Sequence, residues 1–196
     1  MYPRRLDGKK KYKNQINRRE GGETKEIKMA KITLQGNEIN TVGNLPKTGD
    51  NLSGITAKLT KGDLSDVQLS EFKGKKVILN IFPSIDTPVC AASVRKFNQE
   101  ASNIGNTKVL CISRDLPFAQ GRFCVSEGIE NVINLSEFKD TEFSTKIGVK
   151  IKDGPMEGLM ARAVLVLDED QKIIYSELVP EIVQEPNYEN ALKALK

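Results

Sequence analysis

Residues 75–98, KKVILNIFPSIDTPVCAASVRKFN, decide the fold class of this chain. Their first eight residues form a near-continuous apolar run, which is typical of a central strand covered on both faces. A helix is expected next, and a second such run follows in TKVLCISRD, residues 107–115. A strand, a helix and a strand at this spacing predict a right-handed parallel crossover. The sequence therefore predicts an α/β sheet.

The segments on either side of this unit predict hairpins and short helices. KITLQGNEINTV (31–42) is typical of a small hairpin that turns at Gly36-Asn37, and ARAVLVLDEDQKIIYSELV (161–179) of one that turns between Asp168 and Lys172. Helices are expected in two further segments, LPFAQGRFCVSEG (116–128) and YENALKALK (188–196).

Length and composition favour one domain, residues 29–196. The chain has 196 residues, 38% hydrophobic and 29% charged, and such a length buries a sizeable core. No apolar run approaches the roughly 18 residues of a membrane span, and the charged N-terminus lacks the apolar region of a secretory signal. Three cysteines, an odd number, suggest a reducing compartment, so we expect a cytoplasmic protein without a membrane partner.

Several kinds of chemistry are excluded by residues that the chain lacks. It contains no histidine, which removes Ser-His-Asp and Cys-His catalysis and histidine-containing zinc sites. It also has no CxxC pair, which excludes a four-cysteine metal site and a thioredoxin-type dithiol. Neither a metal nor a cofactor is expected, and the chemistry must come from isolated thiols, hydroxyls, carboxylates, lysines and arginines.

Residues 1–28 form a separate basic segment. They carry ten Lys or Arg against four Asp or Glu, so their charge is +6, whereas the whole chain has +4 and the remainder therefore −2. This segment has almost no apolar periodicity, and we predict a disordered extension. It could be a nucleic-acid arm, an extension without a role, or a translated leader ahead of a start at Met29. We favour the last two interpretations and expect no nucleic-acid partner.

One thiol stands just inside the predicted helix start. Pro88 suits the first helical position and Thr87 the N-cap, which makes Cys90 the third helical residue. Amides without intrahelical partners and the helix dipole stabilise negative charge there, so we expect a larger thiolate fraction than usual. A small core hydrophobe is the alternative interpretation of such a lone cysteine. Helical spacing places this thiol at the solvent-facing end of a buried stripe with Val94, Phe97, Ala101 and Ile104.

The motif around this thiol resembles that of a known family. The pattern Pro83-x-x-x-Thr87-x-x-Cys90 matches the peroxidatic-cysteine motif of peroxiredoxins. Together, NIFPSIDTPVCAASVRKFN and VLCISRDLPFAQGRFC closely resemble the atypical two-cysteine peroxiredoxins of the bacterial thiol peroxidase type. The resemblance covers about residues 31–196.

This resemblance implies a thioredoxin-like fold, in its peroxiredoxin variant with an N-terminal β-hairpin, and a homodimer. It also implies reduction of hydrogen peroxide and organic hydroperoxides at the expense of thioredoxin. By the same resemblance, Cys90 is the peroxidatic thiol that becomes a sulfenic acid, and Cys124 is the resolving thiol that forms a disulfide with it. Thr87 supplies a hydroxyl to the sulfur and the peroxide, Pro83 shields the thiolate from water, and Arg162 faces it.

From the residues alone, some of these assignments stay open. Arg162 is more simply interpreted as a solvated arginine at a strand edge, and Thr87 as a cap alone. Cys111, inside an apolar strand, is expected to be a core thiol. A redox-sensing adaptor, whose disulfide switches a partner surface, remains the alternative to a peroxidase.

Overall fold

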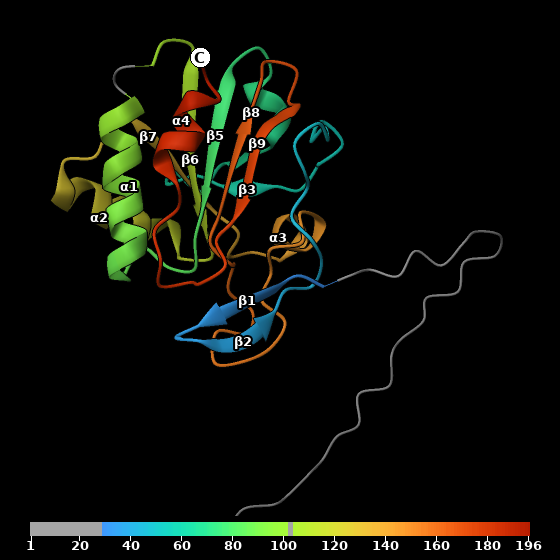
Figure 1. The fold of residues 1–196 in the computed structure, drawn as a ribbon. Coiled ribbons are helices and arrows are strands. Elements are labelled where there is room, and N and C mark those ends of the chain that lie inside the picture. Colours follow the sequence, from blue (N-terminus) through green and yellow to red (C-terminus); the bar gives the residue numbers. More distant parts are fainter. Residues whose placement is uncertain (1–28, 102–103) are drawn as a thin grey trace, which may run out of the picture.

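The computed structural model describes residues 29–101 and 104–196, in which helices pack against a central sheet (Figure 1). The predicted extension, residues 1–28, lies outside the described residues. The strands are β1 (Lys31–Leu34), β2 (Asn37–Asn40), β3 (Leu59–Thr60), β4 (Asp66–Val67), β5 (Lys76–Ile81), β6 (Thr107–Ser113), β7 (Val132–Ser136), β8 (Ala163–Leu167) and β9 (Ile173–Leu178). The helices are η1 (Leu69–Phe72), α1 (Pro88–Ala101), α2 (Pro117–Glu127), α3 (Glu142–Lys146) and α4 (Tyr188–Lys193).

The large sheet has its parallel strands at the centre. Among the described residues it contains seven strands in the order β4-β3-β7-β6-β5-β8-β9, with β5, β6 and β7 parallel and β8 and β9 antiparallel. The predicted strand–helix–strand crossover is confirmed as β5, α1 and β6. The predicted C-terminal hairpin is confirmed as β8 and β9.

Both faces of the sheet are buried, as the apolar runs predict. Along β5, Val77, Leu79 and Ile81 belong to one hydrophobic cluster, and Ile78 and the following Phe82 belong to another on the opposite face. The second cluster also contains residues of α1 and α4, which cover this face (Figure 1). Ile78 and Phe82, which face the second cluster, are therefore the residues of this segment that hold α1 in place.

The N-terminal hairpin turns one residue earlier than the sequence suggested. Leu34 pairs with Asn37, so the turn residues are Gln35 and Gly36, and not Gly36-Asn37 as expected. Both have positive φ, 51° for Gln35 and 79° for Gly36. A two-residue turn of this kind needs positive φ at both positions to match the strand twist, and a glutamine occupies the first of them.

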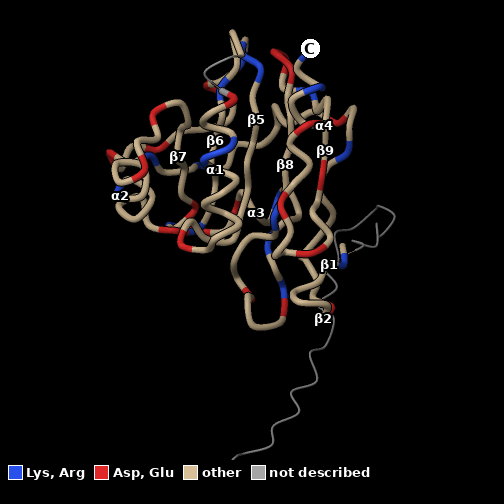
Figure 2. Tube along the Cα trace, turned by 60° about the vertical axis from the view of Figure 1, so that its left-hand side comes forward, with Lys and Arg blue, Asp and Glu red and all other residues tan. Residues whose placement is uncertain are grey.

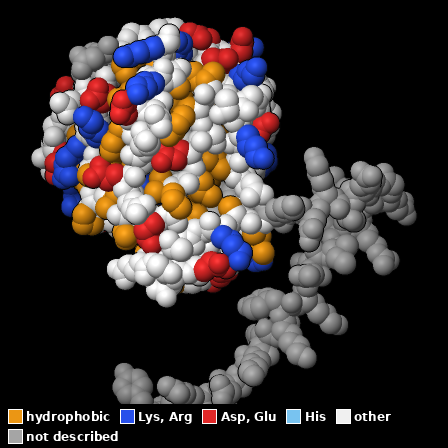
Figure 3. All heavy atoms as spheres, viewed as in Figure 1, with side chains coloured by type: hydrophobic (Ala, Val, Ile, Leu, Met, Phe, Trp, Pro, Cys, Tyr) orange, Lys and Arg blue, Asp and Glu red, His pale blue; other side chains and the backbone are white. Residues whose placement is uncertain are grey.

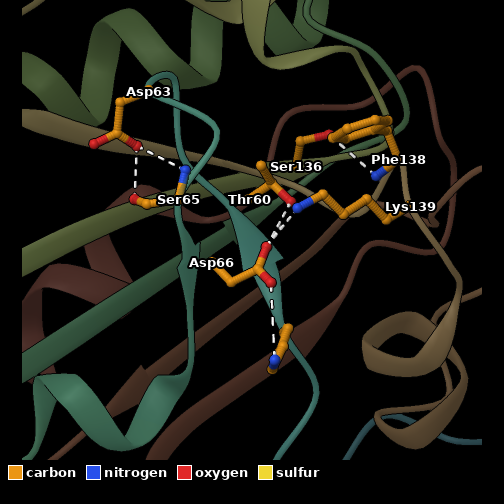
Figure 4. A network of polar contacts seen from close by, with 8 residues as sticks. Thr60, Asp63, Ser65, Asp66, Ser136, Phe138 and Lys139 are labelled. Carbon is orange, nitrogen blue, oxygen red and sulfur yellow. Dashed lines mark hydrogen bonds and ion pairs between the residues drawn. The ribbon is translucent and has the colours of Figure 1, made fainter.

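A network of charged and hydroxyl groups ties the edge strand β4 and its neighbour β3 to the segment that follows β7 (Figure 4). Lys139 Nζ lies 2.6 Å from Asp66 Oδ1, which also accepts a hydrogen bond from Thr60 Oγ1 at 3.5 Å. The β3–β4 turn is closed by Ser65, whose hydroxyl donates to Asp63 at 2.6 Å. Short, charged strands of this kind discourage edge-to-edge pairing with other chains.

Charged residues of both signs are spread along the described chain (Figure 2). On the side that carries α1 and α4, apolar side chains reach the surface between these charges (Figure 3). Within the described ranges, no helix is long and apolar enough to cross a bilayer.

Candidate active site

The helix start that the sequence predicts is present. α1 begins at Pro88, Thr87 precedes it, and the amide of Ala91 donates to the Thr87 carbonyl at 3.0 Å. Cys90 is therefore the third helical residue, among the amides that have no partner within the helix. This position places the partial positive charge of the helix N-terminus beside the sulfur.

Cys90 is more deeply buried than the sequence analysis expected. We expected a position between core and solvent, but the residue is 0% exposed and belongs to the cluster with Phe82, Val94 and Phe97. Pro83 is also buried. A substrate therefore cannot touch the sulfur unless the covering side chains move locally.

Arg162 is the second defining residue of the site. Its Nη2 donates to Cys90 Sγ at 3.4 Å, and Nε and Nη2 donate to the Ile182 carbonyl at 3.1 and 3.0 Å. Arg162 is 1% exposed, so the interpretation as a solvated strand-edge arginine is wrong. Among the described residues, Nη1 has no hydrogen-bond partner. The guanidinium therefore offers one more donor in the buried space around the thiol.

The loop between β5 and α1 is held by a carboxylate that the sequence analysis did not identify. Asp115 accepts hydrogen bonds from Ser84 Oγ and from the Ile85 amide, each at 2.7 Å. A third bond, also 2.7 Å, comes from Ser113 Oγ. Asp115 follows β6, whose carboxyl end lies at the same sheet edge as that of β5, and this placement could have revealed it. Thr87 lies in the same loop, and its hydroxyl donates to the Ser84 carbonyl at 3.0 Å.

A buried polar pair supports the first turn of α1. Ser93 Oγ donates to the Cys90 carbonyl at 2.8 Å and accepts from Asn80 Nδ2 at 3.2 Å. Both Ser93 and Asn80 are 0% exposed. The sequence signal was Asn80 itself, a single amide in the apolar run of β5.

Cys111 is a core thiol, as predicted. It lies in β6, is 0% exposed, and faces Asn80 Nδ2 at 3.7 Å. Burial raises the pKa of the Cys111 thiol to about 12, so it is protonated at neutral pH. A protonated thiol is a poor nucleophile.

Cys124 is more accessible than the other two cysteines. It is half-buried in α2, and its sulfur accepts a hydrogen bond from Asn134 Nδ2 at 2.8 Å. Burial raises the pKa of the Cys124 thiol, and the bond from Asn134 opposes that effect. All three cysteines are free thiols. Cys90 lies in α1 with Arg162 as its partner, and Cys124 lies in α2 with Asn134 as its partner.

A thiol at the N-terminus of the helix that follows a central parallel strand, facing a buried arginine, defines a thiol-dependent redox protein of the α/β class. Comparison with known proteins narrows this class, since residues 47–192 match the Redoxin family. The chain belongs to this family and, within it, to the bacterial thiol peroxidases, which are oxidoreductases of the peroxiredoxin type.

The named relatives agree with this assignment. Thiol peroxidases of Mycobacterium tuberculosis and Mycobacterium bovis are 58% identical over 167 residues, which cover 85% of this chain and 99% of theirs. The structure of a peroxiredoxin-like protein from Aquifex aeolicus is 38% identical with a TM-score of 0.77, over 85% of this chain and 96% of that one. A thiol peroxidase from Chromobacterium violaceum, 20% identical, shares the fold with a TM-score of 0.77 over 84% of this chain and 95% of its own. The thioredoxin-like fold is thereby confirmed.

Proposed function

We propose that the chain reduces hydrogen peroxide and organic hydroperoxides with Cys90 as the peroxidatic thiol. The thiolate sulfur attacks the OH oxygen of the peroxide, the O–O bond breaks, and the sulfur becomes a sulfenic acid. The departing hydroxide or alkoxide takes up a proton from solvent and leaves as water or an alcohol. The observation that carries this proposal is the 3.4 Å contact between Arg162 Nη2 and Cys90 Sγ.

The contact supports the proposal because the reaction needs charge stabilisation and no histidine base. A guanidinium stays protonated at any physiological pH and offers several donors in one plane. Nη2 is directed at the sulfur, and Nη1, which has no other partner among the described residues, could serve the oxygen that leaves. Thr87 would orient the peroxide with its hydroxyl oxygen, and Pro83 would keep water from the thiolate.

For the second step we propose Cys124 as the resolving thiol. Its sulfur attacks the Cys90 sulfur, the S–OH bond breaks, and the hydroxide takes up the proton of the Cys124 thiol to leave as water. Cys111 is the less suitable candidate, because its pKa of about 12 and its complete burial in β6 keep it protonated and inaccessible.

An external dithiol then has to reduce the disulfide, and thioredoxin is the reductant that we propose. The argument comes from the family, as does the homodimer, whereas the cytoplasmic location is proposed from the odd number of cysteines. Cys124 belongs to α2, which lies at the outside of the molecule, where a reductant can approach it (Figure 2).

Peptide mapping of the reduced protein after one equivalent of hydroperoxide tests the whole proposal. We expect a Cys90–Cys124 disulfide and full recovery of Cys111 as a thiol. Repeated peroxide consumption with thioredoxin, its reductase and NADPH is expected in the same sample. A single stoichiometric oxidation without turnover would favour the redox-sensing adaptor instead.

A further inference from the structure

The side of α2 that faces the protein makes polar contacts as well as apolar ones, since Pro117 is buried and Phe123 and Cys124 pack against the second hydrophobic cluster. Gln120, Cys124 and Glu127 lie four and three residues apart, so they share one face of the helix. Gln120 Nε2 donates to Ser113 Oγ at 2.9 Å, and Glu127 accepts from Arg95 Nε at 2.7 Å. On other sides of α2, Phe118 (63%) and Val125 (86%) are exposed, as is Leu116, which precedes the helix. Hydrogen bonds therefore contribute to the attachment of this helix alongside the apolar packing.

Between the contacts of Gln120 and Glu127 lies that of Cys124, whose sulfur is hydrogen-bonded by Asn134. Asn134 Nδ2 lies 2.8 Å from Cys124 Sγ. Asn134 belongs to β7, where it pairs with Cys111 of the neighbouring strand β6, so its backbone is fixed in the central sheet. The side-chain amide of Asn134 donates to a half-buried sulfur, and such a donor stabilises the thiolate more than the thiol. Packing of α2 against the sheet would not by itself need this contact.

We propose that Asn134 is a positioning residue for the resolving step, and that its amide holds the Cys124 sulfur and stabilises its thiolate. This inference rests on the proposed role of Cys124. In the resolving step the Cys124 thiol first loses its proton, the thiolate attacks the Cys90 sulfur, and the new S–S bond replaces the S–OH bond. The departing hydroxide takes up a proton equivalent to the one that Cys124 lost and leaves as water. A larger thiolate fraction on Cys124 makes this attack faster.

Asn134 could instead serve only to hold α2 against the sheet, and the two roles predict opposite shifts in the titration of Cys124 when Asn134 is replaced. Burial raises the pKa of Cys124, and the bond from Asn134 lowers it. If Asn134 only fastened α2, its loss would expose the thiol, weaken the effect of burial and move the titration of Cys124 to lower pH. If Asn134 stabilises the thiolate, its loss moves that titration to higher pH.

Asn134→Leu and Asn134→Asp test the proposal, and Gln120→Leu is the matched control. Leucine has a similar volume and no donor, and aspartate keeps the shape but directs negative charge at the sulfur. Gln120 docks the same helix without touching Cys124. The reduced full-length chains are treated with iodoacetamide across a pH series, and alkylation of the Cys124 peptide is followed by mass spectrometry. Disulfide formation after one equivalent of hydrogen peroxide is followed by rapid quenching.

We expect the alkylation midpoint of Cys124 to move to higher pH in both Asn134 variants, most in Asn134→Asp. At neutral pH, disulfide formation should slow by roughly tenfold in Asn134→Leu, as the loss of a hydrogen bond to a charged group implies. Sulfenic acid should form on Cys90 at the parental rate. In Gln120→Leu the midpoint should stay or move to lower pH.

A midpoint that stays or moves to lower pH in the Asn134 variants would overturn the inference, as would an unchanged rate of disulfide formation. Failure of the proposed function looks different, because Cys124→Ser would then keep thioredoxin-dependent turnover. If one Asn134 variant does not fold, the other still decides between the two directions of the shift.

Discussion

Arg162 Nη2 lies 3.4 Å from Cys90 Sγ, although 72 residues separate them in the chain. Strand pairing explains the contact. β8 runs antiparallel to β5 with Ala163 opposite Ile81, so Arg162 stands at the sheet edge where the chain leaves β5 towards α1. The Ile182 carbonyl then directs the guanidinium by accepting two of its hydrogen bonds.

Arg162→Lys should keep the fold but slow the oxidation of Cys90 by hydrogen peroxide by roughly a hundredfold. A lysine ammonium carries the charge but lacks the planar arrangement that bonds the Ile182 carbonyl and the sulfur together. Stopped-flow measurement of the second-order rate constant checks this, with circular dichroism as the test of folding. Arg122→Lys, at an exposed position, should react at the parental rate. Equal rates in both variants would mean that Arg162 does not assist the chemistry.

Asp115→Ala should loosen the loop between β5 and α1. The variant loses three acceptor contacts, to Ser84, Ile85 and Ser113, and we expect the free energy of unfolding to fall by about 2 kcal/mol. Urea denaturation measures that loss, and hydrogen exchange at the Ile85 amide locates it. The oxidation of Cys90 should slow as well, because Pro83 and Thr87 belong to the same loop. An Ile85 amide that stays protected would show that other contacts hold the loop.

The central sheet and the position of Cys90 could be predicted because local patterns determine them. An apolar run of strand length and a Thr-Pro helix start can both be recognised within about twenty residues of sequence. The environment of Arg162 could not be predicted in this way, since its burial depends on the pairing of β8 with β5 and on the loop that carries Ile182. From the residues alone, solvent was the better interpretation, and only the resemblance to peroxiredoxins placed this arginine at the thiol.

Asn80, Ser93 and Asp115 were missed for a related reason. Each is a single polar residue in or beside an apolar segment, and its role depends on a partner from another element. The hairpin turn lies one residue earlier than the pattern predicts, because Gln35, and not Gly36, occupies the first turn position, with a φ of 51°. Contacts across elements and individual backbone angles are therefore what the sequence pattern leaves undetermined.

The hydrogen bonds between the N-terminal hairpin and the Glu181 carboxylate should break only in strong acid. Its carboxylate accepts hydrogen bonds from the Gly36 amide, the Thr33 hydroxyl and the Gln35 amide, and these bonds, with Gly36 foremost, lower its pKa to about 2. Because the folded pKa lies below the usual 4.5, the stabilisation is complete above about pH 4.5 and is lost as the pH falls through 2. The amide resonance of Gly36 should titrate near pH 2 in the parent and not at all in Glu181→Gln. A midpoint near 4.5 would contradict these bonds.

Cys111→Ser should leave peroxide turnover with thioredoxin nearly intact. The sulfur lies in the central strand β6, and a hydroxyl there should lower the free energy of unfolding by about 1–3 kcal/mol. Cys111→Ala, which adds no polar group, should turn over equally well and separates polarity from loss of volume. In the folded parent, iodoacetamide should fail to label Cys111 at neutral pH, since burial raises its pKa to about 12. Loss of turnover in both variants would give this thiol a place in the reaction.

Cys90→Ser and Cys124→Ser should fail at different steps. Cys90→Ser should consume no peroxide, because a hydroxyl at neutral pH is no comparable nucleophile. Cys124→Ser should consume one equivalent and keep a sulfenic acid on Cys90, which dimedone labels, and excess peroxide should then drive that sulfur to sulfinic acid. Thioredoxin-dependent turnover should largely stop, because no disulfide with Cys90 forms. Normal recycling in Cys124→Ser together with failure in Cys111→Ser would transfer the resolving role to Cys111, against its burial and its raised pKa.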